Sequence, residues 1–143
     1  MSLYVDTSAL AKWYVAESGS EAFDDFMCHH SPTHISRLTI VELRCMLARR
    51  RRNQQLTAAV EKKVFREFES HIRDGIFVVL AMSDAHFVRA LEILGELRSL
   101  PLRTLDALHL AVADSQDIAT IATADQVMVD AARALKFDTQ IFH

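Results

Sequence analysis

The chain has 143 residues, of which 50% are hydrophobic and 24% are charged, and its formal net charge is −3. This length suits one domain with its own core, so we expect residues 1–143 to form a single domain. The charge excludes a polycation that binds nucleic acid over its whole surface. Any contact with RNA or DNA must therefore come from a local basic patch or from metal ions.

The first predicted strand covers residues 3–5, a short apolar run of the kind that is buried in parallel sheets. Asp6 follows where this strand should end. Thr7 and Ser8 are candidate N-caps for a helix that continues to residue 14, and Asp6 is an alternative cap. A carboxylate therefore falls at the carboxyl end of a strand, which is the edge where open α/β sheets bind ligands.

Strands and helices alternate through the rest of the chain. Further strands are predicted at residues 33–36, 76–80, 119–122 and 138–142. Further helices are predicted at about residues 21–28, 39–52, 57–73, 103–115 and 126–135, with another that begins after the caps Ser83 and Asp84. This order predicts a three-layer α/β/α sandwich with a parallel sheet of four to five strands.

Apolar stripes predict which helix faces are buried. The helix at residues 57–73 has apolar residues every fourth position: Leu56, Val60, Val64, Phe68 and Ile72. The helix after Ser83 has the stripe Phe87, Leu91, Leu94 and Leu97. The helix at residues 39–52 is apolar around much of its girth, with the two stripes Leu38, Val41, Cys45 and Ile40, Leu43, Leu47.

The two cysteines, Cys28 and Cys45, fall inside predicted helices and form no disulfide framework, which favours a reducing compartment. No charged-then-apolar leader opens the chain, and its longest apolar run, residues 76–82, is much shorter than a membrane span. We therefore expect a cytoplasmic protein with no membrane segment.

Four acidic residues fall near predicted strand ends or helix starts: Asp6, Glu42, Asp106 and Asp125. Each has a plain structural explanation. Glu42 completes a capping-box pattern with Thr39, Asp106 lies where it favours a helix dipole, and Asp125 is a candidate N-cap.

Together, the four acids predict a cation site. Clustered carboxylates repel and raise one another's pKa unless a cation neutralises them. Donor sets made only of oxygen suit Mg²⁺ or Mn²⁺, and a hard cation with open positions suits hydrolysis of phosphodiester bonds.

The segments around these acids resemble the PIN-domain pattern. They read Leu-Tyr-Val-Asp6-Thr-Ser-Ala-Leu, Val-Glu42-Leu, Leu-Asp106-Ala-Leu-His-Leu-Ala and Thr-Ala-Asp125. Among PIN domains, the chain most resembles the VapC toxins of bacterial toxin–antitoxin pairs. The resemblance covers nearly the whole chain and implies a metal-dependent endoribonuclease with Mg²⁺ or Mn²⁺ in an acidic pocket.

Carried over residue by residue, the resemblance makes the same four acids the catalytic and metal-binding residues. It makes Thr7, Ser8 and Thr123 supporting residues, with Ser8 or Thr7 orienting Asp6 and Thr123 acting near Asp125. It also implies an RNA substrate, a homodimer, and a VapB-like antitoxin whose C-terminal segment blocks the pocket.

Several arginines, histidines and cysteines in the sequence have more than one possible role. The run Arg49–Arg52 suits RNA phosphates, an acidic partner or a solvated helix end. Arg37, Arg44 and Arg103 are candidates for guiding substrate. His109, one turn from Asp106, is either an acid–base group or part of a packed helix face. A zinc site is not supported, because the spacing of Cys28, His29, His30 and His34 fits no closed site.

Two other functions compete with the nuclease hypothesis. One is a catalytically silent PIN-like module that binds RNA or a peptide at the same edge. The other is a phosphatase or receiver-like domain, which the early position of Asp6 and the poor position of Lys136 disfavour.

Overall fold

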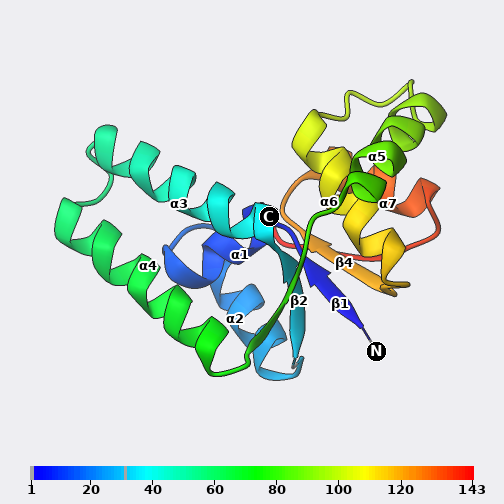
Figure 1. The fold of residues 1–143 in the computed structure, drawn as a ribbon. Helices are drawn as coiled ribbons and strands as arrows, with labels where there is room; N and C mark the ends of the chain where they lie inside the picture. The colour runs from blue at the N-terminus through cyan, green and yellow to red at the C-terminus, as the bar shows by residue number, and fades with distance from the viewer. Residues whose placement is uncertain (1, 31) are drawn as a thin grey trace.

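The computed structural model describes residues 2–30 and 32–143. The strands are β1 (Leu3–Val5), β2 (Thr33–Ser36), β3 (Phe77–Leu80), β4 (Thr120–Thr123) and β5 (Asp138–Ile141). The helices are α1 (Thr7–Tyr14), α2 (Ser20–Cys28), α3 (Arg37–Arg52), α4 (Ala58–Arg73), α5 (Asp84–Glu96), α6 (Thr104–Ser115) and α7 (Gln126–Ala134). Figure 1 shows this order from the blue N-terminus to the red C-terminus.

The strands form one sheet in the order β3-β2-β1-β4-β5, and every neighbouring pair is parallel. β1 is the central strand, with Tyr4 opposite both His34 of β2 and Ile121 of β4. Because parallel strands end at the same edge of a sheet, the residues that follow β1, β2 and β4 come together there. The predicted three-layer α/β/α sandwich is confirmed, with five strands.

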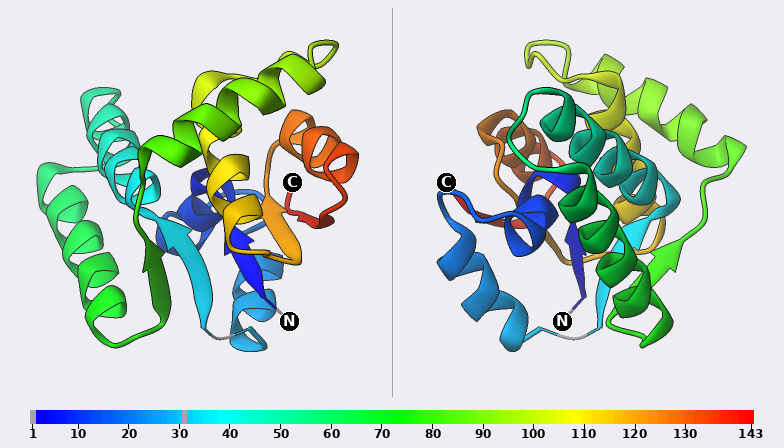
Figure 2. Two further views of the ribbon diagram at one scale, coloured as in Figure 1. Left: turned by 45° about the vertical axis from the view of Figure 1, so that its right-hand side comes forward. Right: turned by 90° about the vertical axis from the view of Figure 1, so that its left-hand side faces the viewer.

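Side chains alternate across β1, and this alternation divides the core in two. Leu3 and Val5 pack into a cluster with buried residues of α1, α2, α3 and α4. Tyr4 points to the opposite face and packs with buried residues of α5, α6 and α7. The two further views in Figure 2 show the helices divided between the two faces in this way.

Two element boundaries near the site differ from the sequence prediction. α3 begins at Arg37, two residues early, because Ser36 caps it and Thr39 closes the capping box by accepting from the Ser36 N–H at 3.1 Å. The capping box predicted for Glu42 is therefore wrong, and its carboxylate is free for other contacts. β4 ends at Thr123 rather than at residue 122, so the Thr123 side chain lies buried at the strand end.

The apolar stripe predicted for α5 is wrong at Phe87 and Leu91, whereas Leu94 and Leu97 are partly buried against the core. Phe87 and Leu91 are 52% and 71% exposed, and the buried positions of this helix are His86, Ala90 and Ile93. The reason lies in the cap of the helix. His86 Nδ1 accepts from the Ser83 N–H at 3.0 Å, and its other ring nitrogen contacts the Ser115 hydroxyl at 2.9 Å, which turns this face toward α6.

The stripes of the other two helices are confirmed in part. On α4, Val64 and Phe68 are buried as predicted, whereas Val60 is 43% exposed. On α3, Leu43 and Leu47 are buried and Ile40 is partly buried, but Val41 is 67% exposed, so this helix is buried on one side only.

Both cysteines, Cys28 and Cys45, are free and exposed. Within residues 2–30 and 32–143, none of the helices combines the length and the hydropathy that crossing a membrane requires.

Candidate active site

Asp6 lies between β1 and α1 and is the N-cap of that helix. Its Oδ1 accepts hydrogen bonds from the Ser8 hydroxyl at 2.7 Å and from the Ala9 N–H at 3.1 Å. Its Oδ2 accepts a hydrogen bond from the Thr123 hydroxyl at 2.7 Å. Burial raises the pKa of this carboxyl, although the charge of His109 and these hydrogen bonds act in the opposite direction. A buried, desolvated carboxylate of this kind favours a neighbouring cation.

Glu42 reaches from α3 toward α1 and α6. Its Oε1 accepts a hydrogen bond from the Thr7 hydroxyl at 2.9 Å and contacts Nε2 of His109. Burial alone would raise the pKa of Glu42. The hydrogen bond and charge of His109, together with Thr7 and Arg103, outweigh burial and lower this pKa. Thr7 therefore contacts Glu42, while Ser8 and Thr123 are the side chains that contact Asp6.

Tyr4 supports His109 from the fully buried side of β1. Its hydroxyl lies 2.5 Å from His109 Nδ1 and donates to the Ser36 hydroxyl at 2.9 Å. A phenol has one proton, so a Tyr4 hydroxyl that donates to Ser36 accepts from the Nδ1–H of His109. Burial raises the pKa of Tyr4, which keeps the phenol neutral. Serine, phenol, imidazole and carboxylate thus form a connected chain that ends at Glu42.

Sequence reasoning assigned no role to Tyr4 beyond the core. A signal was nevertheless present, because a tyrosine in the middle of a fully buried strand needs a partner for its hydroxyl. His109 does fill a packed helix face, and the same side chain also contacts a candidate site residue.

Asp106 and Asp125 are linked by Arg103. Asp106 lies in the first turn of α6, and its Oδ2 is 3.4 Å from the backbone N and 3.4 Å from Nε of Arg103. Asp125 caps α7 by accepting from the Val127 N–H at 2.9 Å, as the alternative interpretation of this residue predicted. Its Oδ2 lies 3.7 Å from the Arg103 guanidinium. One guanidinium therefore bridges acids from two separate helices.

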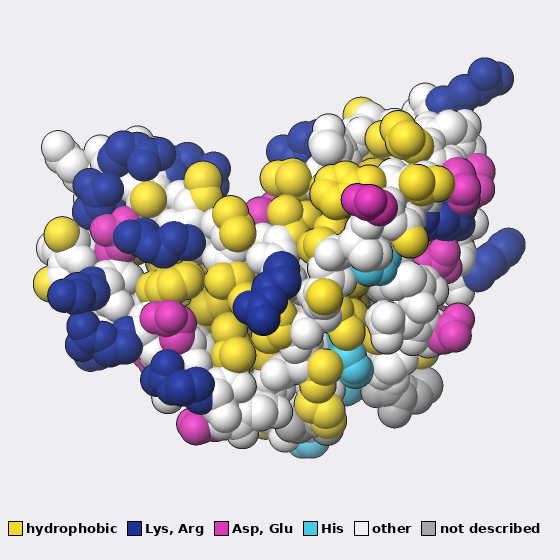
Figure 3. Space-filling view, viewed as in Figure 1, with side chains coloured by type: hydrophobic (Ala, Val, Ile, Leu, Met, Phe, Trp, Pro, Cys, Tyr) yellow, Lys and Arg dark blue, Asp and Glu magenta, His cyan; other side chains and the backbone are white. Residues whose placement is uncertain are grey.

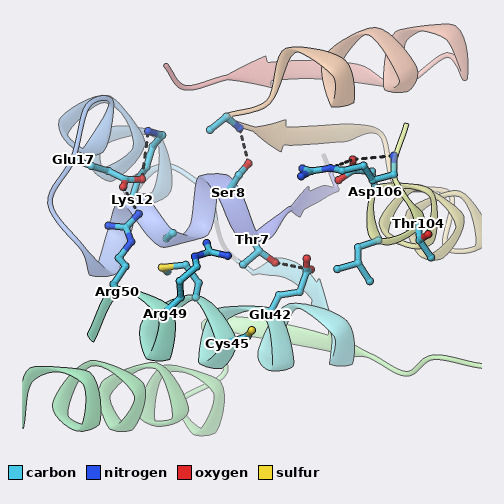
Figure 4. A pocket seen from close by; sticks show the side chains of 15 residues that line it. Thr7, Ser8, Lys12, Glu17, Glu42, Cys45, Arg49, Arg50, Thr104 and Asp106 are labelled. Atoms are coloured by element: carbon cyan, nitrogen blue, oxygen red, sulfur yellow. Dashed lines mark hydrogen bonds and ion pairs between the residues drawn. The ribbon is translucent and has the colours of Figure 1, made fainter. Parts of the chain in front are cut away.

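A cavity of about 610 Å³ opens beside these residues. Thr7, Ser8, Glu42 and Asp106 line one part of it, as Figure 4 shows, and basic side chains line the part toward the C-terminus of α3. Figure 3 shows the surface hollowed between the α3–α4 side of the molecule, where Lys and Arg side chains gather, and the α5–α6 side. The pocket thus joins an acidic region to a basic one.

Glutamates of the same chain partly neutralise the basic side chains in and beside this cavity. Arg50 pairs with Glu17 at 2.6 Å, and the buried Lys12 lies 3.5 Å from the same glutamate. Arg51 pairs with Glu61 at 2.8 Å on the neighbouring surface. Arg49 lines the cavity and is exposed, so it is the arginine of the run best placed to meet a ligand there.

The oxygen donors at this edge suit Mg²⁺ or Mn²⁺, but they do not form a closed cage. Within the described part of the chain, no three Asp, Glu, His or Cys side chains lie close enough to hold one ion together. This spacing still fits Mg²⁺, which is usually held by one or two carboxylates, with waters and substrate phosphates as its other ligands. The donor chemistry therefore fits a hard cation that is completed by substrate.

Residues 3–134 match the family model of the PIN domain. The chain belongs to the PIN domain family. The resemblance inferred from its acidic segments is thereby confirmed at the level of the family. No curated protein matches the chain.

Solved structures show the same fold in proteins of low sequence identity to this PIN domain. VapC20 of Mycobacterium tuberculosis, described as a sarcin-ricin loop cleaving toxin, has a TM-score of 0.73 at 18% identity, covering 91% of this chain and 95% of its own. FitAcB of Neisseria gonorrhoeae has a TM-score of 0.75 at 17% identity, with 96% and 95% covered. DNA-bound VapBC of Salmonella typhimurium has a TM-score of 0.72 at 15% identity, with 99% and 98% covered.

Proposed function

We propose that this PIN domain is a metal-dependent endoribonuclease, the VapC-like toxin of a toxin–antitoxin pair. One observation supports the proposal: the four acids come from segments far apart in the sequence and lie near the carboxyl edge of one parallel sheet, where Glu42 and Asp106 line a cavity with an arginine wall. An acidic centre needs a cation to approach a phosphodiester, and the arginines suit the flanking phosphates of a nucleic acid.

The residues proposed to hold Mg²⁺ or Mn²⁺ are Asp6, Glu42, Asp106 and Asp125, with one or two of these carboxylates on any one ion and waters and substrate phosphates as its other ligands. Such an ion stabilises negative charge on the reacting phosphate and lowers the pKa of a water molecule. The chain's own contribution is to hold these carboxylates in place. Ser8 and Thr123 fix both oxygens of Asp6, while Thr7 and His109 fix Oε1 of Glu42.

RNA is the proposed substrate, and the name of the structurally similar VapC20, a sarcin-ricin loop cleaving toxin, supports this choice. We further propose a VapB-like antitoxin as partner, with its C-terminal segment over the pocket. The solved VapBC complexes of the same fold support a partner of this kind. A homodimer in the cytoplasm, with residues 1–143 acting as a single domain, completes the proposal.

The proposal predicts metal-dependent cleavage that requires the acids. Purified protein with Mg²⁺ or Mn²⁺ should cleave a structured RNA, and EDTA should stop the reaction. Asp6→Asn and Asp106→Asn should each lower the cleavage rate by at least about a hundredfold, because each removes a charge that holds the ion. The measurement is the initial rate on end-labelled RNA resolved by gel electrophoresis.

The matched control is Asp130→Asn, the same change at an exposed acid of α7 whose side chain accepts a hydrogen bond from Gln126. It should cleave at the wild-type rate. Wild-type rates in both Asp6→Asn and Asp106→Asn would refute the assignment of the site. Binding of RNA without metal and without turnover would instead support the silent binding module.

A further inference from the structure

Arg103 lines the cavity together with Asp106 and Glu42. It is the N-cap residue of α6, with extended backbone angles of φ −90° and ψ 163°. Its guanidinium lies 3.4 Å from Asp106 and 3.7 Å from Asp125. These two acids are candidate ligands of the divalent ion, so Arg103 places a positive charge beside the carboxylates that a metal would need.

The contacts of Arg103 are loose compared with those of other arginines in the chain. Its side chain is 79% exposed, and both contacts to carboxylates exceed 3.3 Å. Arg50 and Arg51 each hold a glutamate at 2.6 and 2.8 Å, with 23% and 39% of their side chains exposed. An exposed ion pair with long distances contributes little to stability. Arg103 therefore leaves its acids at little cost.

Electrostatic repulsion by a bound divalent ion would favour movement of the Arg103 side chain away from the two acids. The guanidinium of Arg103 lies within 3.7 Å of both Asp106 and Asp125, so it already acts as a counter-ion for these acids. A divalent ion at the same carboxylates would repel the guanidinium. The side chain also lines the cavity, so a displaced guanidinium stays within the space that the proposed substrate would enter. Its planar fork of N–H donors suits two phosphate oxygens at once.

We propose that Arg103 is a movable cation that screens Asp106 and Asp125 in the metal-free protein and turns to a phosphate of the RNA substrate when a divalent ion is bound. The proposal rests on the proposed nuclease function. Arg103 then competes with the metal for the two carboxylates and also binds the substrate. Removing its charge should therefore raise the affinity for the metal and lower the rate of cleavage.

The test measures both effects in the full-length protein. Isothermal titration with Mn²⁺ should show that Arg103→Gln binds the ion about threefold to tenfold more tightly than wild type, because a competing positive charge is gone. At saturating Mn²⁺, the same variant should cleave RNA at least about tenfold more slowly, because a phosphate contact is lost. Arg103→Lys should recover part of the cleavage rate, since it restores the charge but not the fork.

The matched control is Arg98→Gln, which removes the same charge from an exposed position in the turn after α5. It should leave Mn²⁺ affinity and cleavage unchanged. A merely structural role for Arg103 would weaken both properties together.

The inference is overturned if Arg103→Gln binds Mn²⁺ no more tightly than wild type does. In that case, the proposed nuclease function still holds as long as the wild-type protein binds the metal and cleaves RNA. Tighter Mn²⁺ binding with an unchanged cleavage rate overturns the phosphate contact. Absence of Mn²⁺ binding in wild type and in Arg103→Gln overturns the metal site itself, and the inference with it.

Discussion

At the scale of single residues, the candidate site depends on buried polar groups that hold one another in place. Glu42 contacts Thr7 and His109, and His109 in turn contacts the hydroxyl of Tyr4. No buried side-chain nitrogen or oxygen lacks a hydrogen-bond partner within residues 2–30 and 32–143. Because each group depends on the next, removing one atom far from the pocket should alter the acid at its end.

Tyr4→Phe removes one oxygen and keeps the ring. We expect a loss of about 1–3 kcal/mol in the free energy of unfolding, because Ser36 and His109 lose a buried partner. RNA cleavage should fall by about tenfold or more, because His109 no longer holds Glu42 in a fixed position. Urea denaturation and initial rates measure the two effects.

Tyr14→Phe is the matched control, since the Tyr14 hydroxyl contacts His71 at 2.6 Å on the other helical layer. This variant should lose stability without losing cleavage. A Tyr4→Phe protein with wild-type activity would contradict a link from Tyr4 to the acidic site.

The buried charge of Asp6 predicts how stability depends on pH. Burial raises the pKa of Asp6 in the folded protein above its ordinary value of 3.8. The folded state therefore holds this proton more tightly than the unfolded state, and stability falls as pH rises from about 4 through the raised pKa. In EDTA near pH 7, Asp6→Asn should be more stable than wild type in thermal denaturation, and this difference should shrink below about pH 4.

Saturating Mn²⁺ should reverse the order of the two proteins, because the ion stabilises a folded state that binds it, by about 2.7 kcal/mol at a hundred times the dissociation constant. Equal responses of wild type and Asp6→Asn to Mn²⁺ would show that Asp6 does not hold the ion.

At the scale of elements, packing decided which side of each helix faces the sheet. α4 buries Phe68 completely, whereas α5 leaves Phe87 52% exposed. Both residues lie on apolar stripes with helical spacing, and the stripes by themselves do not distinguish them. The cap formed by His86 and Ser83, and the contact of His86 with Ser115, turn α5 so that Phe87 faces outward.

The two phenylalanines allow a direct test of this difference. Phe68→Ala should lower the free energy of unfolding by about 3–5 kcal/mol, because it leaves a cavity between α4 and the sheet. Phe87→Ala is the same chemical change at an exposed position and should change stability by no more than about 0.5 kcal/mol. Chemical denaturation of both variants measures the difference, and similar losses in the two would contradict the observed orientation of α5.

At the scale of the whole molecule, charge is unevenly distributed despite a net charge of only −3. Internal pairs with Glu17 and Glu61 neutralise Arg50 and Arg51. Arg49 remains exposed at the cavity, and Arg52 is exposed outside the cavity lining. A mildly acidic protein can therefore present a short basic wall at this cavity.

This distribution predicts which arginine contacts RNA. In EDTA, where no cleavage is expected, Arg49→Gln should weaken binding of single-stranded RNA and lower the slope of log affinity against log salt by about 0.7, the value for one lost phosphate contact. Arg52→Gln, an identical change of charge three residues away, should have a much smaller effect. Fluorescence anisotropy over a salt series measures both slopes. Equal slopes for the two variants would show that the cavity wall does not select the contact.

The sequence alone determined the local features of this protein. Hydrophobic periodicity and cap residues predicted the alternation of strands and helices, because these features depend on neighbours a few positions away. The apolar run before Asp6 and the segments around the other three acids also predicted the PIN fold. The metal, the RNA substrate and the single domain stay predictions.

Only the tertiary structure decided which groups meet. The contact of Tyr4 with His109 joins residues 105 positions apart. The contact of Arg103 with Asp125 joins the N-caps of α6 and α7, which β4 separates along the chain. Such contacts depend on strand order and on the rotation of each helix against its neighbours. Packing of the whole core fixes both, and no local pattern encodes them.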